Sequence, residues 1–137
     1  MTAPVIVDAG PLVAMLVERD QHHQWTREVL EEIEPPLLTC EAVVSEACFL
    51  VRNLERGRDA VLRLVATQVV RIGFELAPEI ERTRKLIQHY ASVPMSLADA
   101  CLVRMTELHR GSRLLTLDDD FRIYRRNGRQ VISVISP

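Results

Sequence analysis

Four carboxylates in this sequence occupy positions where an acidic residue is either costly to bury or chemically useful. Asp8 and Asp118 each follow directly on a short, mostly apolar run. Glu46 and Asp99 instead interrupt apolar residues that recur at helical spacing. If such side chains gather in one place, they repel one another and raise each other's pKa values. A hard divalent cation with oxygen ligands removes that repulsion, and Mg²⁺ is the natural choice. The four residues therefore predict a shared metal site.

Each acid also has a simpler interpretation. An Asp at the end of a strand often only caps a helix or forms a turn. A core-facing carboxylate often pairs with an arginine, and Arg52 and Arg104 are the candidates here. These interpretations stay open for each residue by itself. Two strand-end acids and two core-facing acids in one small domain nevertheless favour a common site.

Strands and helices alternate along the chain and must position these acids. Short apolar runs predict strands, and apolar residues three or four apart predict helices. The expected strands cover 4–8, 37–39, 69–74, 113–118 and 130–135, and the expected helices cover 12–17, 21–34, 41–54, 59–68, 78–91, 95–109 and, more briefly, 119–126. This alternation is typical of an α/β domain whose parallel sheet carries helices on both faces. In such sheets ligands bind beyond the carboxyl ends of the strands.

Composition narrows the class of protein. The 137 residues show no repeat, low-complexity segment or long linker, which indicates one domain over 1–137. A net charge of −2 disfavours a simple nucleic-acid-coating protein, but not a nuclease whose acids surround metal ions. The three cysteines form no Cys-x-x-Cys pair, so we expect reduced thiols. With no membrane-length apolar run and no secretory signal, we expect no membrane association and a cytoplasmic location.

The segments around the four acids resemble the acidic motifs of PIN-domain proteins, particularly the VapC-type toxins. They occur in the family's order and cover nearly the whole chain. The resemblance rests on Val-Asp8-Ala-Gly-Pro-Leu-Val-Ala, Val43-Val-Ser-Glu46-Ala, Met95-Ser-Leu-Ala-Asp99-Ala and Leu115-Thr-Leu-Asp118-Asp-Asp-Phe121. Each motif is weak alone, but their order and spacing together are fairly specific.

The resemblance implies a PIN-like three-layer sandwich with a central, mostly parallel sheet. It also implies that Asp8, Glu46, Asp99 and Asp118 are both the catalytic and the metal-binding residues, with Asp120 as an auxiliary carboxylate. The cofactor would be Mg²⁺, for which Mn²⁺ can substitute. The reaction would be hydrolysis of RNA phosphodiester bonds by an endoribonuclease, with 5′-phosphate and 3′-hydroxyl product ends. A VapC-type toxin would also have a cognate antitoxin protein as partner and form a homodimer.

Two further features concern the same site. Arg122, Arg125, Arg126 and Arg129 follow Asp118 closely and are candidates for contacting RNA phosphates, although a solvated charged surface explains them equally well. Related sequences often have Asp where this chain has Ser96. This departure leaves the four primary acids intact, but it bears on how firmly a second metal ion would be held.

Two other functions remain as alternatives. The first is a PIN-like protein that binds RNA or a partner without cleaving, which only Ser96 favours. The second is a phosphoryl-transfer protein, either a receiver or a haloacid-dehalogenase-type phosphatase, because both place an Asp at the end of the first strand. The phosphatase expects a second Asp where Gly10 stands. A receiver expects a Lys near the end, whereas the chain's one lysine, Lys85, lies in a predicted helix.

Overall fold

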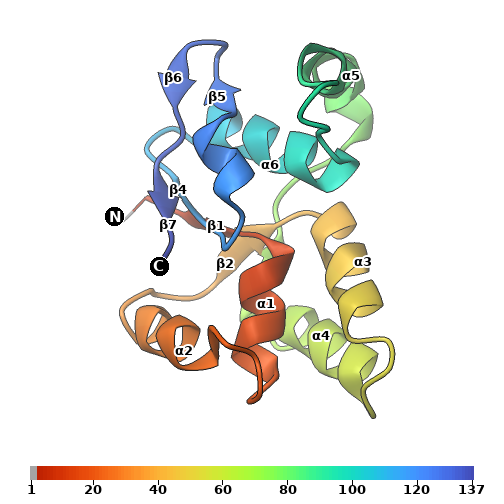
Figure 1. Cartoon of the computed structure of the whole chain (residues 1–137), viewed down its shortest axis with the longest axis vertical. Helices are drawn as coiled ribbons and strands as arrows, with labels where there is room; N and C mark the ends of the chain where they lie inside the picture. The colour runs from red at the N-terminus through yellow and green to blue at the C-terminus, as the bar shows by residue number, and fades with distance from the viewer. Residues whose placement is uncertain (1–2) are drawn as a thin grey trace.

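Five short strands form one sheet in which every neighbouring pair is parallel (Figure 1). The computed structural model describes residues 3–137. The strand order is β3-β2-β1-β4-β7. The strands are β1 (Val5–Val7), β2 (Leu37–Thr39), β3 (Val70–Ile72), β4 (Arg113–Leu115) and β7 (Val134–Ile135). All residues of β1 and β2 are buried, as expected for the centre of a parallel sheet covered on both faces.

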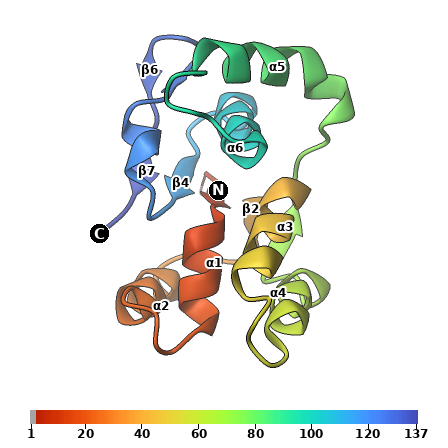
Figure 2. The same ribbon diagram turned by 45° about the vertical axis from the view of Figure 1, so that its right-hand side comes forward.

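Helices cover both faces of this sheet, which confirms the predicted α/β three-layer architecture (Figures 1 and 2). One face carries the helices that connect the first three strands, and the other carries those between β3 and β4. The first group is α1 (Ala9–Leu16), α2 (His23–Glu31), α3 (Glu41–Leu50) and α4 (Gly57–Ala66); the second is the 3₁₀ turn η1 (Ala77–Glu79), α5 (Ile80–His89) and α6 (Leu97–Leu108). Helix α6 lies against β1 and β4 and is buried along most of its length.

The C-terminal segment differs from its sequence-based prediction. Instead of a helix over 119–126, the chain forms a 3₁₀ turn, η2 (Asp119–Arg122), and then β5 (Arg125–Arg126). The strand expected over 130–135 is divided into β6 (Gln130–Val131) and β7. Strand β6 pairs antiparallel with β5 in a separate two-stranded ribbon, whereas β7 joins β4. Between the two pairings, Ile132 is buried in the core.

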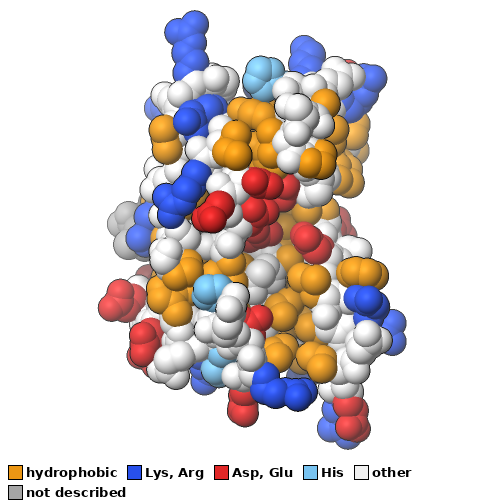
Figure 3. Space-filling model, viewed as in Figure 1, with side chains coloured by type: hydrophobic (Ala, Val, Ile, Leu, Met, Phe, Trp, Pro, Cys, Tyr) orange, Lys and Arg blue, Asp and Glu red, His pale blue; other side chains and the backbone are white. Residues whose placement is uncertain are grey.

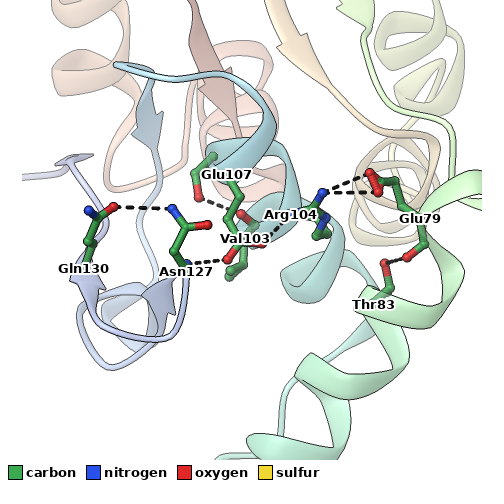
Figure 4. A network of polar contacts seen from close by, with 8 residues as sticks. Glu79, Thr83, Val103, Arg104, Glu107, Asn127 and Gln130 are labelled. Atoms are coloured by element: carbon green, nitrogen blue, oxygen red, sulfur yellow. Dashed lines mark hydrogen bonds and ion pairs between the residues drawn. The ribbon is translucent and has the colours of Figure 1, made fainter.

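A buried arginine joins this hairpin to the helical layer (Figure 4). Arg104 on α6 donates from Nη2 to Glu79 Oε1 at 3.0 Å and from Nη1 to Glu107 Oε1 at 2.7 Å. Glu107 also accepts a hydrogen bond from the backbone N–H of Asn127. One guanidinium group therefore holds together α6, the start of α5 and the turn of the β5–β6 hairpin.

Two expectations from composition can be compared with the structure. All three cysteines are unpaired: Cys40 and Cys101 are buried, and Cys48 is half-buried. Within residues 3–137, no helix combines the length and the apolar character needed to cross a membrane.

Candidate active site

The strand order changes direction between β1 and β4, which lie side by side in the sheet. Val7 pairs with Leu115, so the carboxyl ends of the two strands meet at the same edge. Asp8 follows β1 immediately, and Asp118 lies three residues after the end of β4. This is the switch point at which parallel α/β sheets bind ligands. The sequence predicted both acids at strand ends, and the pairing of β1 with β4 brings them together.

Asp8 is held on both of its carboxylate oxygens. Its Oδ1 accepts a hydrogen bond from the backbone N–H of Ala9 at 2.7 Å, which makes Asp8 the N-cap of α1. Its Oδ2 accepts a hydrogen bond from the Thr116 hydroxyl at 2.8 Å. The Thr116 oxygen in turn accepts a hydrogen bond from the backbone N–H of Asp118 at 3.0 Å. The simple interpretation of Asp8 as a helix cap is therefore correct, but the same contacts also fix its side chain at the switch point.

All four predicted acids line one open pocket at this edge, with a volume of about 460 Å³. They come from four different segments: the end of β1, helix α3, helix α6 and the loop after β4. Figure 3 shows the acidic side chains gathered in the middle of this face, with apolar side chains above and below them. The lining residues are Asp8, Ala9, Gly10, Glu46, Leu50, Asp99, Leu117, Asp118 and Asp119.

Asp119 lines the pocket as a fifth acid, whereas Asp120, the predicted auxiliary carboxylate, is not among the lining residues. The backbone N–H of Asp120 donates to Asp118 Oδ1 at 2.9 Å, and so tethers one oxygen of that carboxylate. The backbone of Asp120 therefore helps to position Asp118, and the role of Asp120 as an auxiliary carboxylate stays a prediction.

The prediction that Glu46 faces the core is wrong. Helix α3 buries Val43 and Ala47, whereas Glu46 and its neighbour Leu50 are exposed at the wall of the pocket. Phe49 and Leu50 remain 59% and 50% exposed, so the apolar residues of α3 do not form a single buried stripe. Glu46 therefore reaches the site from an accessible surface, not from the protein interior.

Asp99 is half-buried in the first turn of α6, where it forms a capping box with Ser96. The Ser96 hydroxyl accepts a hydrogen bond from the backbone N–H of Asp99 at 3.0 Å, and Asp99 Oδ2 accepts one from the backbone N–H of Ser96 at 3.4 Å. Ser96 is exposed and does not line the pocket. The serine that departs from the related sequences therefore serves here as the N-cap of the central helix.

This geometry predicts the effect of changing Ser96. We expect Ser96→Ala to lower the free energy of unfolding by about 1 kcal/mol, because one N-terminal backbone N–H of α6 loses its acceptor. Ser96→Asp keeps an acceptor and should stay within about 0.5 kcal/mol of the wild type. Urea unfolding followed by circular dichroism measures both, with the exposed Ser92→Ala as control. Equal stability of Ser96→Ala and Ser92→Ala would contradict the assignment.

Burial and mutual repulsion perturb the acids in this pocket. Burial, followed by the charges of Glu46 and Asp99, raises the pKa of Asp8 to about 6, although its bonds to Thr116 and Ala9 oppose the shift. Partial desolvation at the pocket wall and the charges of Asp99 and Asp118 raise the pKa of Glu46. Burial and the charge of Asp118 raise the pKa of Asp99, although hydrogen bonds with Tyr124 and Ser96 oppose the shift. Close carboxylates with raised pKa values are typical of a site that attracts cations.

No arginine lines the pocket, and within residues 3–137 the ion pair made by a lining acid is that of the exposed Asp119, whose Oδ1 lies 3.7 Å from Arg122 Nε. Arg104 pairs with Glu79 and Glu107 instead. Arg52 lies over the Phe49 ring, with its guanidinium carbon 3.8 Å from the ring centroid. The simpler interpretation, in which Glu46 or Asp99 pairs with one of these arginines, is therefore not realised.

The four arginines proposed to contact RNA lie outside the pocket lining. Arg122 donates to the Ser136 hydroxyl, and Arg125 donates to the backbone carbonyls of residues 122–124. Arg126 lies in β5, and Arg129 is exposed at the hairpin. The arginines are grouped on η2 and the β5–β6 hairpin, and their contact with RNA stays a prediction.

The chemistry of the lining residues fits a hard divalent cation. Their donors are carboxylate oxygens, the ligands that Mg²⁺ and Mn²⁺ prefer, and the lining carries no basic side chain. In the described part of the chain, no three His, Cys, Asp or Glu side chains are already assembled as a metal cage. The acids instead surround an open pocket, which suits a cation that keeps several of its waters.

The fold and the site define an α/β protein with an acidic, cation-attracting pocket at the switch point of a parallel sheet. The family model of the PIN domain matches residues 5–127, so the chain belongs to the PIN-domain family, and this membership implies a nuclease. Family membership also excludes the phosphoryl-transfer alternative.

The crystal structure of Mycobacterium tuberculosis VapC20, a Sarcin-Ricin loop cleaving toxin, has the same fold. The TM-score is 0.72 over 85% of this chain and 91% of that chain, at 18% sequence identity. No curated protein matches the sequence.

Sequence analysis missed one residue of the site. Tyr124 lies in the segment predicted as a helix, yet its hydroxyl donates a hydrogen bond to Asp99 Oδ2 at 3.0 Å. The two residues are 25 positions apart, so no local pattern connects them. The sequence-level signal is only a tyrosine shortly after the last acidic motif.

Proposed function

We propose that this protein is a Mg²⁺-dependent endoribonuclease that hydrolyses RNA phosphodiester bonds. The observation that carries the proposal is the convergence of Asp8, Glu46, Asp99 and Asp118, from four segments, on one pocket whose lining holds no basic side chain. Membership of the PIN-domain family supports the same chemistry. The alternative of a PIN-like binding protein without activity rested on Ser96, which caps α6 outside the pocket.

The four acids would hold the metal ion, with Asp120 as the proposed auxiliary carboxylate. When bound, Mg²⁺ would acidify a water molecule and stabilise negative charge on the phosphate and the leaving oxygen. Asp8 and Asp118 are positioned by the Thr116 hydroxyl, which contacts both residues. Glu46 stands on the exposed wall and has no hydrogen bond within residues 3–137 that would hold it in place, which leaves it free to adjust toward metal and substrate.

We further propose that the protein is the toxin of a type II toxin–antitoxin pair acting in the cytoplasm. Its PIN fold resembles that of VapC20, which is a toxin. The acidic pocket is open, and its negative charge suits occlusion by Arg or Lys side chains of an antitoxin. A homodimer is expected from the same resemblance.

The first test is cleavage of a mixed RNA pool by antitoxin-free protein. We expect cleavage with Mg²⁺ or Mn²⁺ and none with EDTA, with 5′-phosphate ends on the products. Glu46→Gln should reduce the rate by about 10²-fold. The substitution removes the charge of one metal ligand, and the bound metal normally stabilises the transition state by several kcal/mol. The matched control Glu41→Gln, also exposed on α3 but outside the pocket lining, should cleave like the wild type.

Two outcomes would count against the proposal. Cleavage that continues in EDTA would remove the metal-dependent mechanism. Absence of cleavage by folded wild-type protein across varied RNAs would favour the binding protein. The toxin assignment is tested separately by induced expression in a bacterial host: growth arrest by the wild type, but not by Glu46→Gln, is expected.

A further inference from the structure

The Tyr124 side chain occupies a fixed position directly behind the acidic pocket. The residue is fully buried, and its ring packs edge-on against two others: the ring centroids lie 5.0 Å from Tyr90 and 5.3 Å from Phe121. The Tyr90 hydroxyl accepts a hydrogen bond from the backbone N–H of Arg125 at 2.9 Å, which holds the residue after Tyr124 in place. Edge-on packing and this backbone bond leave the Tyr124 ring little freedom to move.

The Tyr124 hydroxyl makes its hydrogen bond to one of the four acids. It lies 3.0 Å from Asp99 Oδ2 and acts as the donor. A carboxylate oxygen can only accept, so the tyrosine hydroxyl supplies the proton of this hydrogen bond.

Both hydrogen bonds to the Asp99 carboxylate fall on the same oxygen. Ser96 donates from its backbone N–H to Oδ2 at 3.4 Å, and Tyr124 donates to Oδ2 as well. Within residues 3–137 no hydrogen bond is made to Oδ1. Oδ2 is therefore held from the helix N-terminus and from the aromatic cluster, and Oδ1 is the oxygen of Asp99 that carries no hydrogen bond.

We propose that Tyr124 is a positioning residue, which orients Asp99 so that Oδ1 faces a bound divalent cation. It acts through Asp99 and does not touch the metal or the RNA. Such supporting hydrogen bonds commonly contribute a factor of about 10 to 100 to metal affinity. This inference rests on the proposed metal-dependent function, because it assigns Asp99 as a metal ligand.

The experiment measures binding of Mn²⁺ alone, by calorimetry on the metal-free full chain, for wild type, Tyr124→Phe and Tyr90→Phe. Tyr124→Phe removes only the hydroxyl and should weaken Mn²⁺ binding about tenfold. Tyr90→Phe removes a hydroxyl from the same cluster that contacts backbone rather than an acid, and should leave the affinity within about twofold. In an Asp99→Asn background, Tyr124→Phe should cause no further loss of affinity.

Cleavage assays give a second readout. Tyr124→Phe should need about tenfold more Mn²⁺ for half-maximal cleavage and recover its rate at excess metal. Unchanged Mn²⁺ affinity in Tyr124→Phe would overturn the inference, and so would an equal loss in Tyr90→Phe, which would indicate general loosening of the cluster. If Tyr124→Phe unfolds at a lower temperature, its affinity is measured below the transition, where circular dichroism shows a complete fold.

These outcomes separate the inference from the proposed function. If the wild type binds Mn²⁺ but cleaves no RNA, the nuclease proposal fails while the affinities still test Tyr124. If the wild type binds no Mn²⁺ at all, both fail. If the wild type binds and cleaves but Tyr124→Phe matches it in both assays, only the role of Tyr124 is rejected.

Discussion

Asp8→Asn is expected to reduce RNA cleavage by about 10³-fold and, in the metal-free protein, to increase stability. The loss of activity follows because Asp8 is the most buried of the four acids and lies at the centre of the switch point. Loss of a metal ligand removes several kcal/mol of transition-state stabilisation, which corresponds to a rate change of about this size. Asparagine retains an oxygen that can accept the Ala9 N–H and cap α1.

The gain in stability has a defined pH dependence. The Asp8 pKa is about 6 in the folded state, against an ordinary value of 3.8, so the folded protein binds the proton more tightly than the unfolded chain. Asp8 therefore does not reduce the free energy of unfolding below about pH 4, where its side chain is protonated. As pH rises through about 6, ionisation of the buried carboxylate lowers the free energy of unfolding. Above that pH, a pKa shift of this size corresponds to a loss of at most about 3 kcal/mol in the free energy of unfolding. Asp8→Asn should be close to the wild type near pH 4 and more stable near pH 8.

Urea unfolding in EDTA at these two pH values measures the effect, and the exposed Asp59→Asn serves as the control for both stability and cleavage. Added Mg²⁺ should stabilise the wild type more than Asp8→Asn, because the ion binds the ionised carboxylate. A variant that is less stable than the wild type at about pH 8 would show that the structural role of Asp8 outweighs its electrostatic cost. A variant that still cleaves at the wild-type rate would remove Asp8 from the active site.

The largest expected effect on stability alone is that of Arg104→Met. This change leaves Glu79 and Glu107 without their shared partner, in side chains that are only 18% and 9% exposed. Removing one member of a buried ion pair costs about 3–5 kcal/mol, because the remaining charge is desolvated and uncompensated. Figure 4 shows why the effect should spread: the same network reaches Asn127 in the hairpin that follows Tyr124.

Thermal and urea unfolding measure this prediction, with two comparisons. Arg84→Met breaks the exposed pair with Glu81, whose side chains are 59% and 70% exposed, and should change stability by less than about 0.5 kcal/mol. A triple variant that combines Arg104→Met with Glu79→Gln and Glu107→Gln should recover much of the loss, because no buried charge remains unpaired. Equal effects of Arg104→Met and Arg84→Met would show that the buried network contributes little.

Local sequence patterns were sufficient for the strands and helices that precede residue 119 and for two of the acids. Short apolar runs mark buried strands, and the residue after such a run must lie at the edge of a parallel sheet. Asp8 and Asp118 could therefore be placed near the site from the sequence. The turn at Asn127-Gly128 was also predictable from local sequence, because both residues readily adopt the positive φ values of 51° and 76° found there.

The remaining features depend on contacts between distant segments. Helical periodicity placed Glu46 on an apolar stripe, but it does not reveal that part of this stripe borders an open pocket instead of the core. The division of residues 130–135 follows from competition between two pairing partners, β5 and β4, which no local pattern records.

The contact of Asp99 with Tyr124 was decided by tertiary structure, whereas its capping box with Ser96 is local to α6. This hydrogen bond exists because the segment that leads into the β5–β6 hairpin lies against α6, and Arg104 meets Glu79 because the start of α5 packs on the same helix. Sequence spacing determines which face of its own helix or strand a side chain occupies. The partner that the side chain meets depends on how separate elements pack, and packing is a property of the whole chain.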